Sequence, residues 1–132
     1  MQGRIPSGHI VLVDDDPHLL SALRFSFEAE GYDVRTFGSG EELLASPALS
    51  AHACIIIDER LPGMSGLETV AQLRIAGVDA PAILVTTHPS AHVTKAAVAA
   101  NVEIVEKPLL DGALGRRVRA VLAAHAPPKN PP

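Results

Sequence analysis

The chain lacks the residues that build cross-linked or membrane-spanning proteins. Its 132 residues include one cysteine, Cys54, so no disulfide bond can form within it and a disulfide-stapled fold is excluded. No apolar stretch approaches the roughly 20 residues that a membrane-spanning helix needs, and no secretory signal is recognisable at the N-terminus. We therefore expect a cytoplasmic protein that does not contact membranes.

The chain also lacks an excess of positive charge. Eleven Lys and Arg residues stand against fifteen Asp and Glu residues, which gives a net charge of −4 at pH 7. Direct binding to nucleic acid calls for a basic face, so we expect none. The arginines Arg116, Arg117 and Arg119 suit a solvated helix face. A hydrophobic fraction of 47% with 20% charged residues is typical of a globular domain and argues against disorder.

A chain of this length suits one domain, which we place at residues 9–124. Residues 1–8 contain Gly, Pro and Ser without periodicity, and we interpret them as a flexible lead-in. Residues 125–132 hold prolines that cannot continue a helix, so we expect a disordered tail. No internal repeat, low-complexity block or second domain is recognisable.

Short apolar runs alternate with segments of helical periodicity. Buried strands of a parallel sheet read as continuous apolar runs. Helix-start signals lie between these runs: Asp16-Pro17, and capping boxes at Ser39–Glu42 and Ser65–Glu68. Strict alternation of five strands and five helices predicts an α/β fold with a parallel sheet covered on both faces. The expected strands lie near residues 9–13, 32–37, 53–57, 82–86 and 102–105.

Four of these strands end in residues that can bind a cation or a phosphoryl group. They are Asp14, Asp15 and Asp16 after the first strand, Asp58 after the third, Thr86 after the fourth and Lys107 after the fifth. Ligands of open α/β sheets bind at this edge. Carboxylates that converge there repel one another unless a cation is present, and Mg²⁺ is a suitable partner. The pattern predicts a site that handles phosphoryl groups.

These residues make the chain resemble the receiver domains of two-component response regulators. The resemblance rests on the acidic pair in Val13–Pro17, the segment Asp58–Gly66, Thr86, and Lys107-Pro108, each at the end of its strand. It covers about residues 9–124, and residues 58–66 and 86–90 are most similar to regulators of the nitrogen-fixation type. It implies a flavodoxin-like, doubly wound sheet of five parallel strands in the order 2-1-3-4-5 with five helices.

The resemblance also implies a metal site. Asp15 would bind Mg²⁺ directly, with Mn²⁺ as an alternative ion. Asp58 and the main-chain carbonyl of Arg60 would complete the protein ligands, and Asp14 would act through a water molecule. Asp16 is interpreted differently, as the N-cap of the first helix.

A phosphorylation site follows from the same resemblance. Asp58 would accept a phosphoryl group from a sensor histidine kinase or a phosphotransfer protein, because a carboxylate can act as a covalent nucleophile. Lys107 would pair with a phosphoryl oxygen as a point charge, and Thr86 would donate a hydrogen bond to one. The protein would then be a switch that assists its own phosphorylation and dephosphorylation, and not an enzyme.

Output would use the face formed by the helix at residues 91–100, the strand at residues 102–106 and the last helix. A downstream protein, an output domain of a longer chain or a second copy of this chain could bind there. One feature departs from the family pattern: Ile104 stands where many receivers have an aromatic ring, three residues before Lys107. No aromatic residue follows Phe37, so a switch based on a moving ring is excluded.

Three alternatives are weighed against this interpretation. A receiver-like scaffold could act without phosphorylation. An Mg²⁺-dependent aspartyl-phosphate phosphatase would need a second acid at the position of Arg60. A flavodoxin relative would need a Gly/Ser/Thr-rich phosphate loop where the acidic residues stand. The sequence does not name the kinase or the partner, nor does it tell a stand-alone protein from a fragment.

Overall fold

The computed structural model describes residues 8–46, 53–107, 109 and 112–124. Five strands and five helices alternate along this part of the chain, as expected. The strands are β1 (His9–Val13), β2 (Asp33–Phe37), β3 (Ala53–Asp58), β4 (Ala82–Thr86) and β5 (Glu103–Glu106). The helices are α1 (Pro17–Ala29), α2 (Gly40–Leu44), α3 (Gly66–Ile75), α4 (Ala91–Ala99) and α5 (Ala113–Ala124). The expected tail, the lead-in up to residue 7 and Pro108 lie outside the described residues.

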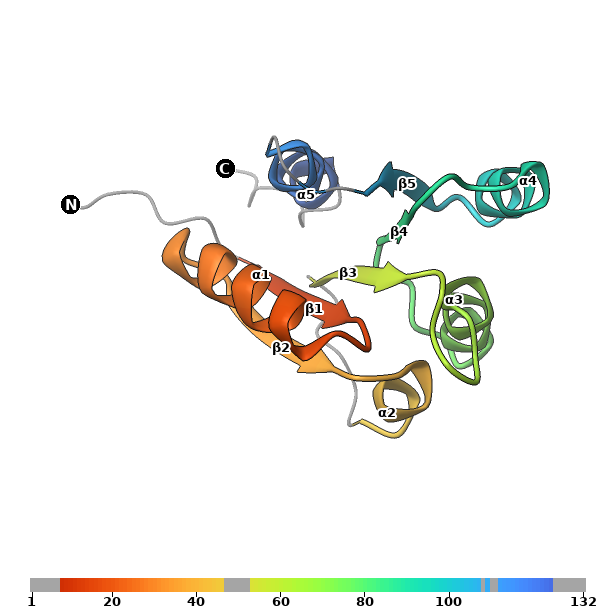
Figure 1. Cartoon of the computed structure of the whole chain (residues 1–132), viewed down its shortest axis with the longest axis horizontal. Helices are drawn as coiled ribbons and strands as arrows, with labels where there is room; N and C mark the ends of the chain where they lie inside the picture. The colour runs from red at the N-terminus through yellow and green to blue at the C-terminus, as the bar shows by residue number, and fades with distance from the viewer. Residues whose placement is uncertain (1–7, 47–52, 108, 110–111, 125–132) are drawn as a thin grey trace, which may run out of the picture.

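The strands form one parallel sheet in the order β2-β1-β3-β4-β5 (Figure 1). This confirms the predicted flavodoxin-like topology. The chain moves outward from β1 to β2, returns to β3 and continues to β5, so the order reverses between β1 and β3. Ligand sites of such sheets lie outside the carboxyl ends of the strands at this reversal.

Alternate side chains of each strand enter two separate cores, because successive residues of a strand point to opposite faces. Ile10 and Leu12 of β1 belong to the core under α1 and α5, together with Phe27 and Val118. Val11 and Val13 belong to the other core, which α2, α3 and α4 cover. The central strands are therefore buried on both faces, and only their ends reach solvent.

The helices begin where the sequence predicts. Asp16 accepts hydrogen bonds from the N–H groups of His18 (2.9 Å) and Leu19 (3.3 Å), which confirms it as the N-cap of α1. The capping box at Ser65 and Glu68 is complete. The one at Ser39 differs in part, since the Glu42 carboxylate accepts the N–H of Gly38 instead of that of Ser39.

Candidate functional site

The register of the sheet brings the predicted site residues to one edge. Val13 pairs with Ile57 across β1 and β3, so Asp14, which follows β1, lies next to Asp58, the last residue of β3. Thr86 ends β4 next to β3, and its carbonyl accepts the N–H of Lys107 at 2.9 Å. Because parallel strands end at the same edge, residues distant in the sequence become neighbours here.

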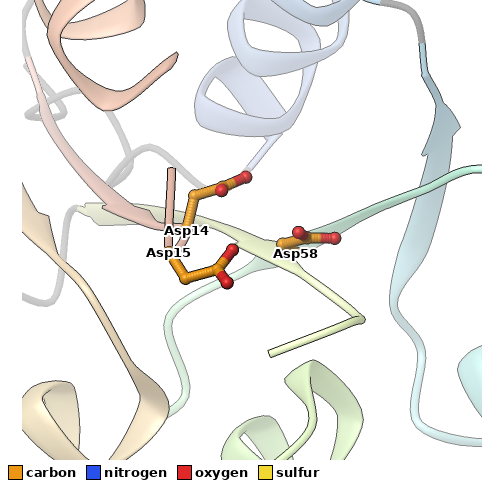
Figure 2. A group of neighbouring side chains, drawn as sticks. All are labelled: Asp14, Asp15 and Asp58. Carbon is orange, nitrogen blue, oxygen red and sulfur yellow. The ribbon is translucent and has the colours of Figure 1, made fainter. Parts of the chain in front are cut away.

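Three aspartates form a cluster at this edge (Figure 2). Asp14, Asp15 and Asp58 each offer a carboxylate oxygen, and these oxygens lie within 4.8 Å of one another. Asp14 and Asp58 are each only 7% exposed, whereas Asp15 is exposed to solvent. Such a group of hard oxygen donors suits a divalent cation such as Mg²⁺, which binds one or two carboxylates and retains water ligands. The residues present therefore fit the predicted ion.

Lys107, which follows β5 at the same edge of the sheet, completes the cluster. Its Nζ lies 3.3 Å from Oδ2 of Asp58 and 3.6 Å from Oδ2 of Asp14. The Lys107 side chain is about a quarter exposed, so these contacts are partly shielded from water. Among the described residues, Lys107 is the one cation that forms ion pairs with this cluster of three carboxylates.

Burial and the neighbouring charges shift the pKa values of Asp14 and Lys107. Burial raises the pKa of the Asp14 carboxyl, and the neighbouring Asp58 raises it further, although the N–H of Asp16 and the charge of Lys107 act in the opposite direction. Burial lowers the pKa of Lys107, but the attraction of Asp58 and Asp14 outweighs it and holds this pKa above its usual value. Burial is thus the main cause of the raised pKa at Asp14, whereas the two carboxylates stabilise the charged form of Lys107.

Thr86 lies at the same edge but is not joined to the cluster. Its side chain is buried, at 3% exposure, on the strand next to β3. In the described part of the chain, no hydrogen bond links its hydroxyl group to Asp58. Asp58 pairs with Val85, the residue before Thr86, so the two side chains belong to neighbouring strands at this edge.

Arg60 lies in the loop of residues 59–65 that joins β3 to α3, and its side chain is exposed. Its N–H donates to Oδ1 of Asp58 at 3.3 Å, so the Asp58 carboxylate is held from the loop side as well. Gly66 closes the loop against the end of β3, since a Cβ there would lie 2.6 Å from the Asp58 carbonyl oxygen. Asp14, Asp15, Asp58 and Lys107 therefore converge, Arg60 contacts Asp58 through its N–H, and Thr86 is adjacent.

Two residues that shape this loop were not predicted from the sequence. Glu59 accepts the N–H of Leu67 at 2.9 Å, and Glu41 of α2 accepts the N–H of Met64 at 3.1 Å. Burial raises the pKa of Glu59, while its hydrogen bond from Leu67 lowers it in part. No local sequence signal identifies either contact, because both depend on how separate segments pack.

The larger hollows of the described surface lie elsewhere. One, of about 200 Å³, is lined by Arg74, Asp79 and Glu103 at the opposite edge of the sheet, and one of about 250 Å³ lies between α1 and α5. At the acidic cluster there is a small hollow of about 10 Å³, whose lining includes Asp14 and Asp58.

Comparison with known proteins identifies the family. Residues 10–119 match the response regulator receiver domain. The chain belongs to this family. Its members function in two-component signalling: they are phosphorylated by histidine kinases, regulate output domains and bind Mg²⁺ at an acidic pocket. They are typically signalling domains and not enzymes.

Individual relatives agree with this assignment. The transcriptional regulatory protein YkoG of Bacillus subtilis, described as uncharacterized, is 36% identical over 117 residues, which are 87% of this chain and 51% of that protein. The transcriptional regulatory protein FixJ of Bradyrhizobium diazoefficiens is 28% identical over 122 residues, covering 91% of this chain and 59% of FixJ. The chain thus spans between half and three fifths of the length of these two relatives.

A solved structure shows the same fold. The response regulator TrrA of Thermotoga maritima, in complex with Mg²⁺–BeF, is 30% identical and has a TM-score of 0.72. The match covers 86% of this chain and 98% of that one. Within the residues that the structure of this chain describes, no helix is both long and apolar enough to cross a membrane.

Proposed function

We propose that this receiver domain is a phosphorylation-controlled switch in which Asp58 accepts a phosphoryl group from the phosphohistidine of a sensor kinase or phosphotransfer protein. The observation that supports it is the placement of Lys107, whose ammonium group lies 3.3 Å from the Asp58 carboxylate within a cluster of three aspartates. A carboxylate held beside a cation, at an open edge of the sheet, is suited to nucleophilic attack on phosphorus.

The transfer uses groups that already lie at this edge of the sheet. An oxygen of Asp58 forms a bond to phosphorus while the bond from phosphorus to the donor imidazole breaks, and the bonding electrons remain on the departing nitrogen. The transferred group carries its charge on three outer oxygens, so positioning and charge neutralisation supply most of the catalysis. Lys107 can move from the carboxylate to one of these oxygens, and the Thr86 hydroxyl can donate to another.

Asp15, Asp58 and the main-chain carbonyl of Arg60 would hold Mg²⁺, with Asp14 acting through water; Mn²⁺ is an alternative ion. When bound, this ion would neutralise the carboxylates and the phosphoryl oxygens that approach them. TrrA, whose structure contains Mg²⁺–BeF, supports this assignment through its 30% identity. Burial and the neighbouring charge of Asp58 both raise the pKa of Asp14, which is a physical reason for a cation to bind.

Phosphorylation adds up to about two negative charges, which would draw Lys107 and Thr86 towards Asp58. We propose that the change is transmitted through β4 and β5 to the face of α4, β5 and α5, where an output domain, another protein or a second copy binds. Ile104 on β5 and Val93 on α4 both pack against the core that contains Ala97 of α4, so the transmission uses aliphatic packing. Such a charge acts by shifting an equilibrium between two conformations.

The test is the incubation of the full chain with Mg²⁺ and acetyl phosphate, followed by intact mass measurement. We expect a gain of one phosphate that requires Mg²⁺ and is absent in Asp58→Asn. Asp33→Asn is the matched control, because Asp33 is an exposed aspartate at the opposite end of the parallel strands. A chain that gains no phosphate under these conditions would support the alternative of a scaffold that acts without phosphorylation.

A further inference from the structure

The loop of residues 59–65 is fixed at both ends by glutamates. On the β3 side, Glu59 donates its N–H to the Val85 carbonyl at 3.0 Å and accepts the N–H of Leu67 on its side chain at 2.9 Å. On the far side, Oε2 of Glu41 accepts the N–H of Met64 at 3.1 Å, across 23 residues of sequence. Glu59 belongs to the loop itself, whereas Glu41 belongs to another element, α2.

The position of Glu41 is set by a close contact between α2 and α3. A Cβ atom at Gly40 would overlap the Thr69 side chain, which is fully buried, so the start of α2 lies directly against α3. The Thr69 hydroxyl donates to the Ser65 carbonyl at 2.8 Å, which in turn ties α3 to the end of the loop. Glu41 follows Gly40 directly and is thereby directed at the turn of residues 63–64.

The turn of residues 63–64 leaves room for the Glu41 carboxylate because residue 63 is a glycine. Gly63 has a φ of +75°, and a Cβ there would lie 2.6 Å from Oε2 of Glu41. The neighbouring Glu42 contacts a different loop, since its carboxylate accepts the N–H of Gly38 at 3.0 Å. The two adjacent glutamates thus have separate roles, and only Glu41 contacts the loop that follows Asp58.

We propose that Glu41 is a positioning residue of the Asp58 site. Its hydrogen bond to Met64 holds the 59–65 loop, and thereby the Arg60 carbonyl, in the conformation that binds Mg²⁺. This inference rests on the proposed function of the site. Glu41 acts through the hydrogen bond and not through its charge, because the side chain is exposed and its field is screened by water.

The experiment compares Glu41→Ala, Glu41→Gln and Glu28→Ala with the wild type, all as full-length chains. Glu28 is an exposed glutamate on α1 that also makes one side-chain contact, with Arg24, so it is a control for lost charge. Mg²⁺ alone is titrated calorimetrically, and hydrogen exchange of the Met64 amide is measured by NMR without metal. Circular dichroism verifies that each variant is folded.

We expect Glu41→Ala to weaken Mg²⁺ binding about five- to tenfold. The loss of a hydrogen bond to a metal ligand typically lowers metal affinity about 10- to 100-fold, and Glu41 acts on the ligand only through the loop. Met64 exchange should accelerate by a similar factor. Glu41→Gln retains an oxygen that can accept the Met64 N–H, so it should stay within about twofold of the wild type in both measurements. Glu28→Ala should match the wild type.

Two results overturn this inference alone: wild-type Mg²⁺ affinity in Glu41→Ala, or an equal loss in Glu41→Gln, which would assign the effect to charge. A wild-type chain that binds no Mg²⁺ overturns the proposed metal site and this inference with it. Gly63→Ala and Gly77→Ala give an independent comparison, since both glycines have positive φ but only Gly63 contacts Glu41. Gly63→Ala should weaken Mg²⁺ binding and Gly77→Ala should not; equal affinities in the two contradict the proposal.

Discussion

The ammonium group of Lys107 lies 3.3 Å from Oδ2 of Asp58, although 49 residues separate the two in the sequence. One residue follows β5 and the other ends β3, and β4 lies between these strands in the sheet. The side chain of Lys107 therefore reaches across the end of β4 to contact Asp58. This reach places a positive charge next to the proposed phosphoacceptor before any phosphoryl group arrives.

Replacement of Lys107 should impair phosphorylation. In Lys107→Met the Asp58 carboxylate loses its cationic neighbour, and the transferred phosphoryl oxygens lose a charged donor. We expect the rate of phosphorylation by acetyl phosphate to fall at least about tenfold, since the loss of one donor to a developing charge typically costs more than that. The rate is measured by intact mass over time. Lys95→Met, an exposed lysine on α4, is the control, and an equal rate in both variants would contradict the role of Lys107.

Asp16 should affect stability but not phosphorylation. Its carboxylate caps α1 through the N–H groups of His18 and Leu19. Asp16→Ala should lower the free energy of unfolding by about 1 kcal/mol, the usual cost of a lost N-cap. Urea denaturation measures this loss. The rate of phosphorylation of the folded variant should stay within about twofold of the wild type, and a large fall would place Asp16 in the site with Asp14 and Asp15.

Gly66 should not tolerate a side chain. A Cβ there would lie 2.6 Å from the carbonyl oxygen of Asp58 and 2.8 Å from Cδ1 of Leu84, and the backbone of β3 cannot retreat within a buried sheet. Gly66→Ala should therefore cost about 1–3 kcal/mol of stability, as overpacking does elsewhere. Gly115→Ala is the opposite case, because Gly115 lies within α5 and its Cβ would meet only the Arg119 side chain at 3.6 Å.

Gly115→Ala should increase stability by about 0.5–1 kcal/mol, the usual difference between alanine and glycine in a helix. Urea denaturation of the two variants, together with the wild type, measures both effects. Two changes of equal size in the same direction would refute the contrast between the closed position of Gly66 and the open position of Gly115.

Cys54 should make the fold sensitive to alkaline pH. Burial raises the pKa of its thiol from 9.0 to about 12. Between these values the folded state holds a proton that the unfolded state releases, so stability is unaffected below pH 9 and falls as the pH rises. The thiol should lower the free energy of unfolding by about 1.4 kcal/mol for each pH unit above 9.

Urea denaturation from pH 8 to pH 11 measures this slope. Cys54→Ala loses some packing at every pH, but it lacks the thiol and should show the shallower decline. Parallel declines in the two proteins would show that other groups, and not Cys54, dominate the alkaline loss of stability. Below pH 9 the thiol should also be inert to alkylating reagents, since it is both buried and protonated.

Position 104 illustrates what the sequence predicts and what only the structure shows. The absence of an aromatic residue at this position, and anywhere after Phe37, is visible in the sequence and excludes a moving ring. What surrounds Ile104 instead could not be predicted: it packs, like Val93 of α4, against the core that contains Ala97. Such packing depends on the register of β5 and the placement of α4, which are long-range properties.

The backbone conformation of His88 could not be predicted from the sequence either. This residue adopts a φ of +49°, which is uncommon for a residue other than glycine, in the loop that follows Thr86. Asn101, by contrast, has a φ of +59° at the end of α4, where asparagine is favoured after glycine. Asparagine at the end of a helix signals this conformation locally, whereas no such signal marks His88.

The sequence by itself determined the alternation of strands and helices, because the apolar runs, N-caps and breakers that define each element are local. It also determined that carboxylates, a hydroxyl group and an ammonium group stand at strand ends. Only the tertiary structure decided which of these groups meet: Lys107 with Asp58 and Asp14, and Glu41 with Met64. Strand register and helix packing fix those distances, and both arise from contacts between segments that are remote in the chain.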